Sequence, residues 1–194
     1  MKELVFATNN PHKLHELQAL LGEEFHLRGL RDIGCNEEIP EDQPTLEGNA
    51  RQKAFHVFEK YGIPCFADDT GLEIEALNGK PGVYSARYAG EEKNSGANMD
   101  KVLRQMAKIN HRKARFRTVI SLVIDGKEMQ FEGVVEGEIT REKQGTGGFG
   151  YDPVFLPAGF SRTFATMDLK EKNSISHRGR AVRKLVHFLQ TTHF

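Results

Sequence analysis

The feature that most constrains the fold is a pair of long strand-like runs joined by a very short turn. Residues 114–124 and 128–139 are rich in β-branched, aromatic and other apolar residues, and they flank Asp125-Gly126, a dipeptide favoured in tight hairpin turns. Each run approaches a dozen residues, which is about 35 Å at the usual rise of a strand. The sequence therefore predicts a long β-hairpin within an elongated sheet.

Ahead of the hairpin, short apolar runs alternate with helical patterns. We predict strands over Leu4–Thr8, Phe25–Leu30 and Cys65–Ala67, and helices over His12–Leu21 and Thr45–Tyr61. The first helix has a proline just before it, and the second has a threonine at its N-cap and a glycine after its last residue. This alternation indicates an α/β fold.

The other predicted elements fill the rest of the chain. Leu72–Leu77 resembles another short strand, residues 78–82 a turn, and residues 97–107 a helix with an apolar face. A last helix over residues 179–191 is expected to close the core. Because no repeat, low-complexity tract or linker divides the chain, we predict a single domain, residues 1–194.

Composition restricts the class of protein. The chain has 194 residues and 38% hydrophobic content, with no apolar run long enough to cross a bilayer and no signal-peptide pattern. Cys35 and Cys65 lack metal-ligand spacing, so both are expected to be reduced. We therefore expect a cytoplasmic protein that is not bound to a membrane.

The formal net charge of zero conceals a division along the chain. Residues 1–100 hold 18 acidic and 10 basic side chains, whereas residues 101–194 hold 9 acidic and 17 basic side chains. One interpretation is that the acidic half binds a metal and the basic half binds phosphate. The alternative is that opposite charges only help the two halves pack together.

Adjacent carboxylates interrupt the strand pattern at residues 63–71. Asp68 and Asp69 follow an apolar run and precede a glycine, which predicts a strand that ends at the carboxylates. Carboxyl ends of strands in open α/β sheets are common ligand sites, and two neighbouring carboxylates favour a cation between them. An ordinary acidic turn is the alternative.

Three loop segments carry further candidate chemistry, and each also has a purely structural interpretation. Residues 7–13 lie between a predicted strand and helix, where backbone N–H groups favour phosphate or simply a helix cap. Residues 145–153 form a glycine-rich loop whose aromatics could stack on a nucleobase or return to the core. Residues 170–180 are basic and hydroxyl-rich, which suits phosphate binding or a helix cap.

Five ordered motifs resemble one family. They are Ala-Thr-Asn-Asn-Pro-His-Lys-Leu-His-Glu (7–16), Phe-Ala-Asp-Asp-Thr-Gly-Leu (66–72), Pro-Gly-Val-Tyr-Ser-Ala-Arg-Tyr (81–88), Gly-Thr-Gly-Gly-Phe-Gly-Tyr-Asp-Pro (145–153) and Ile-Ser-His-Arg-Gly (175–179). With them the chain resembles the inosine triphosphatase-like, non-canonical purine nucleoside triphosphate pyrophosphatases. Where many relatives have serine after the paired aspartates, this chain has Thr70, which keeps the hydroxyl.

The resemblance implies an enzyme, a homodimer that hydrolyses inosine, deoxyinosine and xanthosine triphosphates (ITP, dITP, XTP) to the monophosphate and pyrophosphate with Mg²⁺. We therefore expect an α/β fold in which an elongated mixed sheet, a long β-hairpin and flanking helices form two lobes around a central cleft. Asp69 is expected to be the catalytic base and, with Glu41, to hold Mg²⁺. Phe149 is expected to stack on the purine. The substrate-binding residues that the resemblance implies are Thr8, Asn9, Asn10, Pro11, His12, Lys13, Lys53, Thr70, Phe149, Gly150, Tyr151, Asp152, Lys172, His177 and Arg178.

Two other functions stay open from the sequence. A related pyrophosphatase could act on other modified nucleotides, which a wider substrate panel would reveal. A non-catalytic nucleotide- or RNA-binding protein could use the basic second half of the chain, and its binding would be sensitive to salt. The zero net charge and the paired carboxylates favour an enzyme that does not bind nucleic acid.

Overall fold

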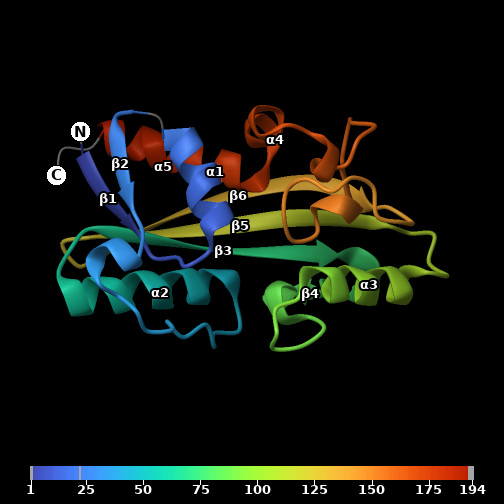
Figure 1. Cartoon of the computed structure of the whole chain (residues 1–194), viewed down its shortest axis with the longest axis horizontal. Helices are drawn as coiled ribbons and strands as arrows, with labels where there is room; N and C mark the ends of the chain where they lie inside the picture. Colours follow the sequence, from blue (N-terminus) through green and yellow to red (C-terminus); the bar gives the residue numbers. More distant parts are fainter. Residues whose placement is uncertain (1, 22, 192–194) are drawn as a thin grey trace. The chain divides into compact units, whose positions relative to one another are not determined.

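The computed structural model describes residues 2–21 and 23–191, and it has the α/β fold that the sequence predicts (Figure 1). The strands are β1 (Lys2–Phe6), β2 (Phe25–Arg28), β3 (Cys65–Ile74), β4 (Pro81–Gly82), β5 (Lys113–Ile124), β6 (Lys127–Ile139) and β7 (Phe155–Pro157). The α-helices are α1 (Pro11–Leu21), α2 (Leu46–Tyr61), α3 (Ser95–Met106), α4 (Leu169–Ile175) and α5 (His177–Thr191). Short 3₁₀ turns cover Arg31–Ile33, Glu75–Leu77, Ser85–Arg87, Asp152–Val154 and Phe164–Thr166.

The strands form a mixed sheet in the order β2-β1-β3-β5-β6-β7, with β4 paired to β3. The pairs of β1 with β2 and with β3 are parallel, whereas those of β3 with β4 and of β6 with β7 are antiparallel. This arrangement confirms the predicted mixed sheet.

The long hairpin is confirmed as β5 and β6, joined at Asp125 and Gly126. The φ angles of these two residues are 50° and 74°. A type I′ turn requires positive φ at both central positions, and its twist matches that of the flanking strands. The dipeptide therefore sets the register of the hairpin.

The chain divides into two compact units. The first contains residues 1–69, 118–133 and 178–194, and the second contains residues 70–117 and 134–177. Each unit has its own buried core among the described residues. The single domain, the elongated form of the sheet and the cleft between two lobes stay predictions.

In the first unit, side chains of the strands alternate between two layers of helix. Leu4, Phe6 and Phe66 pack with α1 and α5, while neighbouring residues such as Val5 and Cys65 pack on the side of α2 (Figure 1). The rings of Phe6 and Phe66 stack with their centroids 4.6 Å apart. Full burial of such a side chain contributes about 1.5–3 kcal/mol, so these contacts fix β1 against β3.

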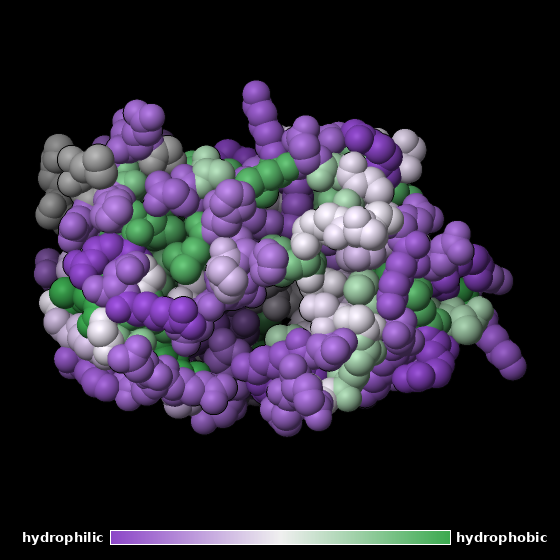
Figure 2. All heavy atoms as spheres, viewed as in Figure 1, coloured by the Kyte–Doolittle hydropathy of each residue, from purple (hydrophilic) through white to green (hydrophobic). Residues whose placement is uncertain are grey.

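Helix α2 is amphipathic. Ala50, Ala54 and Val57 are fully buried, whereas its outer surface is hydrophilic in the view of Figure 2. As predicted, Thr45 caps its N-terminus by accepting a hydrogen bond from the backbone N–H of Gly48, and a glycine with a left-handed conformation ends it. Its inner face therefore has a fixed orientation.

The second unit is built around aromatic contacts between strands. The ring of Phe116 on β5 lies 4.5 Å from that of Phe155 on β7 and 6.1 Å from that of Phe164, centroid to centroid. Met99, Val102 and Met106 of α3 pack on this core, as the sequence predicts. These contacts hold β7 and the loops beside it in place.

Two predictions about the strand with the paired aspartates are wrong. The strand does not end at the carboxylates, because β3 continues through them to Ile74, and Leu72–Leu77 is not a separate strand. Pairing with β1 stops at Phe66, but β5 and β4 also pair with β3 and supply further backbone partners. Asp68 and Asp69 are therefore held rigidly inside a strand.

Other elements differ in their bounds. The basic segment predicted as a loop contains α4, and α5 begins at His177, two residues earlier than predicted. Cys35 and Cys65 are buried and form no disulfide, as expected. Within the described ranges, none of the helices has both the length and the apolar character needed to span a bilayer.

Candidate active site

Asp68 and Asp69 point to opposite faces of the sheet because they are successive residues of β3. The residues just before them show the alternation: Phe66 packs with α1 and α5, and Ala67 packs on the α2 side. Both carboxylates are buried, with 1% and 8% of their surface exposed. The two adjacent carboxylates therefore have different neighbours.

Asp68 lies in a chain of buried charges. Lys13 Nζ donates to its Oδ1 at 2.8 Å, Arg178 Nε donates to its Oδ2 at 3.3 Å, and Arg178 Nη1 donates to Glu16 Oε2 at 2.5 Å. Burial alone would raise the pKa of Asp68, but the attraction of Lys13 and Arg178 outweighs it and holds that pKa well below its usual range. Asp68 is therefore ionised at neutral pH and holds Lys13 in place.

Asp69 has a different environment on the α2 side. Asn49 Nδ2 donates to its Oδ2 at 3.1 Å, and Lys53 Nζ lies 3.9 Å from its Oδ1. The same ammonium donates to Glu41 Oε1 and to the backbone oxygen of Asp68, both at 2.7 Å. Burial raises the pKa of the Asp69 carboxyl, and the attraction of Lys53 only partly offsets that effect. Asp69 is thus the more basic of the two carboxylates.

The residues around Lys53 fit a magnesium ion that is shared with a bound anion. Mg²⁺ is usually held by one or two carboxylates together with waters and substrate phosphates, and Glu41 and Asp69 offer two carboxylates beside one ammonium. Within residues 2–21 and 23–191, no group of three or more His, Cys, Asp or Glu side chains is suited to a metal. Glu41 and Asp69 could therefore supply part of a coordination shell.

The segment between β1 and α1 caps the helix. Asn10 Oδ1 accepts hydrogen bonds from the backbone N–H groups of His12 and Lys13, at 3.0 and 3.4 Å, and Thr8 Oγ1 accepts from the Asn10 N–H at 3.1 Å. The exposed residues of this segment are Asn9, Pro11 and His12. The interpretation of this segment as a helix cap is confirmed. The N-terminus of α1 is its positive end, and together with the Lys13 ammonium it favours an anion.

A second group of predicted residues lies in the second unit. Lys172 Nζ donates to Asp152 Oδ2 at 2.7 Å and lies 4.7 Å from the centroid of the Phe149 ring. The same Asp152 oxygen accepts from the Phe149 N–H at 2.9 Å. Lys172 and Asp152 are buried, while Phe149 is half-buried. The ion pair therefore fixes the backbone and the ring of the glycine-rich loop.

The two aromatic residues of that loop lie in different environments. Tyr151 returns to the core, where its hydroxyl donates to the backbone oxygen of Ser85 at 2.6 Å. Gly148 has a φ of +67°, and a Cβ there would collide with the Asp152 carboxylate. Phe149 is thus the aromatic residue of this loop with exposed surface. Glycine is needed at position 148 because the backbone there lies close to the Asp152 carboxylate.

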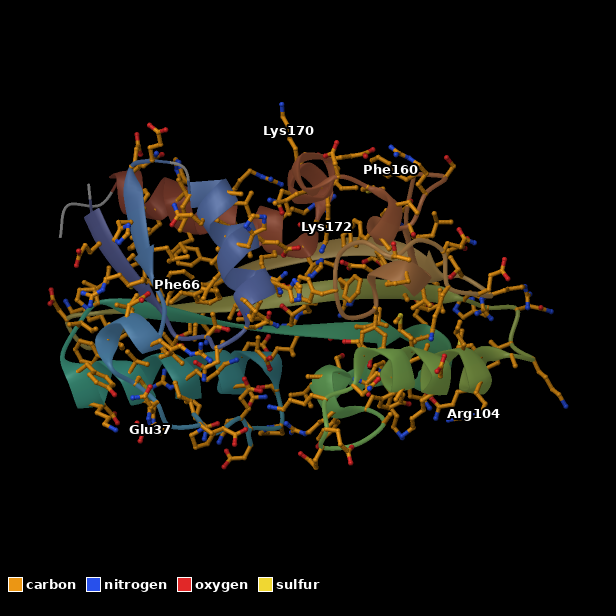
Figure 3. The ribbon with its side chains drawn as sticks, in the orientation of Figure 1. Glu37, Phe66, Arg104, Phe160, Lys170 and Lys172 are labelled. Atoms are coloured by element: carbon orange, nitrogen blue, oxygen red, sulfur yellow. The ribbon has the colours of Figure 1, made fainter. Side chains whose placement is uncertain are left out.

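The two lysines of α4 differ in exposure. Lys170 projects outward, whereas Lys172 points inward (Figure 3). His177 is buried, with its ring stacked on Phe116 at 4.6 Å between centroids. The remaining predicted residues of this unit, both half-buried, are Thr70 and Gly150.

The predicted residues thus divide between the two units. Arg178, one of the predicted substrate-binding residues, bonds Asp68 and Glu16 through its guanidinium, in the first unit. Sequence reasoning assigned no role to Glu16 or Asn49. The available signal was helical spacing, because Glu16 follows Lys13 by three residues and Asn49 precedes Lys53 by four.

Buried carboxylates paired with lysine and arginine, in an α/β protein, could hold a metal together with an anionic ligand. The chain belongs to the Ham1 family, whose model matches residues 4–188. The resemblance found in the sequence is therefore confirmed.

Relatives and solved structures agree with this assignment. The chain is 53% identical over 190 residues to a dITP/XTP pyrophosphatase of Flavobacterium johnsoniae, covering 98% of this chain and 99% of the relative. It is 55% identical over 190 residues to a dITP/XTP pyrophosphatase of Porphyromonas gingivalis, covering 97% and 98%. These names confirm the predicted enzyme class, a nucleoside triphosphate pyrophosphatase.

The fold matches solved structures as well. The structure of a HAM1 protein from Coxiella burnetii matches with a TM-score of 0.90 and 40% identity, over 99% of this chain and 100% of that one. The Staphylococcus aureus Ham1 protein matches with a TM-score of 0.88 and 38% identity, over 97% and 98% of the two chains. The α/β fold is thus shared along nearly the whole chain.

Proposed function

We propose that this protein hydrolyses ITP, dITP and XTP, with Mg²⁺, to the nucleoside monophosphate and pyrophosphate. The names of the relatives support the substrate class. The observation that carries the chemistry is the environment of Asp69, a buried carboxylate whose pKa is raised, beside Lys53 and Glu41. Removing non-canonical triphosphates would keep them from polymerases.

In this proposal, the first unit binds the triphosphate. The ammonium of Lys13 and the N-terminus of α1 neutralise phosphate oxygens, and Asp68 holds Lys13 in place for this contact. Glu41 and Asp69 hold Mg²⁺, which would neutralise charge on the phosphates. Lys53 adds a further positive charge beside both carboxylates.

Asp69 also acts on the attacking water. A carboxylate with a raised pKa accepts a proton more readily near neutral pH than an ordinary aspartate does. The rigid position of Asp69 inside β3, with Asn49 as a donor, keeps the accepting oxygen oriented. Phosphoryl transfer needs chiefly positioning and neutralisation of charge, so these groups suffice.

Phe149, Lys172 and His177 are the residues proposed to bind the purine. Phe149 stacks on the base, an interaction worth about 1–3 kcal/mol. Lys172 and His177 are the candidate donors to the oxygen at position 6, and Asp152 sets the place of Lys172. Adenine presents an amino group there, which would leave a buried donor without a partner at about 1–3 kcal/mol per group.

Arg178 has a positioning role in the first unit. Because it bonds both Asp68 and Glu16, it fixes the carboxylate that binds Lys13. A homodimer and a cytoplasmic location complete the proposal. The homodimer rests on the family resemblance, and the location rests on the composition of the chain. Size-exclusion chromatography with light scattering tests the dimer.

A substrate panel tests the proposed function. Initial rates of pyrophosphate release are measured for ITP, dITP, XTP, ATP and GTP, with and without Mg²⁺. We expect kcat/KM to be about 10-fold to 100-fold higher for the first three than for ATP, because adenine has an amino group at position 6. Equal turnover of all five nucleotides would contradict the proposed specificity, and turnover unaffected by Mg²⁺ would contradict the proposed cofactor.

A further inference from the structure

Asn49 connects two segments that hold the carboxylates beside Lys53. Its Oδ1 accepts a hydrogen bond from the backbone N–H of Gln43 at 2.9 Å, and its Nδ2 donates to Asp69 Oδ2 at 3.1 Å. Gln43 is two residues from Glu41, in the segment that runs alongside α2 (Figure 1). One buried amide, 1% exposed, therefore bonds both to β3 and to the segment containing Glu41.

Helix spacing puts this amide in register with the ammonium. Asn49 and Lys53 are four residues apart on α2, so they lie on the same face of the helix. Lys53 donates to Glu41 and to the backbone oxygen of Asp68. Asn49 bonds Gln43, two residues after Glu41, and Asp69, the residue after Asp68. The two side chains thus form parallel links from one helix.

Asparagine meets both requirements at this point. The Gln43 N–H needs an acceptor and the Asp69 carboxylate needs a donor, and an amide offers one of each. An aspartate here would put a second carboxylate against Asp69, and an apolar residue would lose both bonds. The bonding pattern therefore also assigns the orientation of the amide.

We propose that Asn49 is a positioning residue that fixes the distance between Glu41 and Asp69 and so sets the affinity of this pair for Mg²⁺. The inference rests on the proposed function, since it requires both carboxylates to hold the metal. Groups that orient metal-binding carboxylates typically change metal affinity about 10-fold to 100-fold when they are removed.

The test uses Asn49→Ala and Asn49→Leu, the second of which keeps the volume if the first folds poorly. The Kd for Mg²⁺ alone is measured by calorimetry, and the Mg²⁺ concentration for half-maximal ITP hydrolysis is measured separately. We expect both quantities to rise about tenfold or more in both variants. A purely structural role would lower the melting temperature and leave both Mg²⁺ values unchanged, which would overturn the proposal.

Gln52→Ala is the matched control. Gln52 also fastens the segment to α2, because its Nε2 donates to Asp42 Oδ1 at 2.8 Å and its Oε1 accepts from the Asp42 N–H at 3.3 Å. We expect Gln52→Ala to leave the Mg²⁺ affinity within about threefold of the wild type, since it makes no bond to Asp69. An equal loss in this variant would overturn the role of Asn49.

The two hypotheses fail in different ways. If the wild-type protein releases no pyrophosphate from ITP with Mg²⁺, the proposed function fails, and the inference about Asn49 fails with it. If the wild type is active and binds Mg²⁺ but the Asn49 variants bind it equally well, only the inference fails.

Discussion

Substitution by asparagine is expected to destabilise the protein much more at Asp68 than at Asp69. Asp68→Asn removes the carboxylate that pairs with Lys13 and Arg178, all three being largely buried. Removing one partner of a buried ion pair typically costs about 3–5 kcal/mol, because the remaining charges lose their compensation. For a chain of this length, that loss lowers the melting temperature by about 10 °C.

Asp69→Asn is expected to lower the free energy of unfolding by less. Burial already disfavours the charged form of Asp69, as its raised pKa shows, so a neutral amide of the same shape loses little. Lys53 keeps Glu41 at 2.7 Å and the backbone oxygen of Asp68 at 2.7 Å. We expect the free energy of unfolding to change by about 1 kcal/mol or less.

Urea denaturation followed by circular dichroism, at pH 7 and with EDTA to remove metal ions, measures both variants against the wild type. Because the two substitutions are chemically identical and one residue apart, each is the control for the other. Equal destabilisation by the two variants would refute the assignment of the carboxylates to opposite faces with different partners. A loss below about 1 kcal/mol for Asp68→Asn would refute the role of the buried ion pairs.

Two further predictions concern the second unit. Gly148→Ala places a methyl group against the Asp152 carboxylate at a φ of +67°, whereas Gly150→Ala, at a φ of +63°, meets open space. The positive φ strains both variants by about 1–2 kcal/mol. Urea denaturation is expected to show the larger loss of stability for Gly148→Ala. Equal losses would contradict the close approach. Lys172→Met is expected to raise the KM for ITP about tenfold or more by removing the buried ammonium. Lys170→Met, on the outer side of α4, is the control and is expected to leave the KM unchanged. Steady-state kinetics measure both variants, and an equal effect of the two would count against base binding by Lys172.

Local patterns were sufficient where a short segment determines its own structure. The hairpin follows from two strand-like runs and a dipeptide that tolerates positive φ at both positions, and α2 follows from its cap, its apolar face and its final glycine. The end of β3 could not be read in the same way. Whether a strand continues past Asp69 depends on β5 and β4, which lie far along the chain.

The candidate site shows the same division. The motifs identified the paired aspartates, but the assignment of Asp68 to Lys13 and of Asp69 to Lys53 depends on which face of the sheet each side chain occupies. A strand period of two already predicts opposite faces for neighbours. Which helix covers each face is a property of the fold, and for that reason Glu16 and Asn49 were missed.

The most direct test of the central claim follows ITP by ³¹P NMR with wild-type protein and Asp69→Asn in the presence of Mg²⁺. The wild type is expected to yield the monophosphate and pyrophosphate in equal amounts, and the variant to turn over at least about 100-fold more slowly while remaining folded. Release of orthophosphate and a diphosphate, or a variant rate within a few fold of the wild type, would contradict the account.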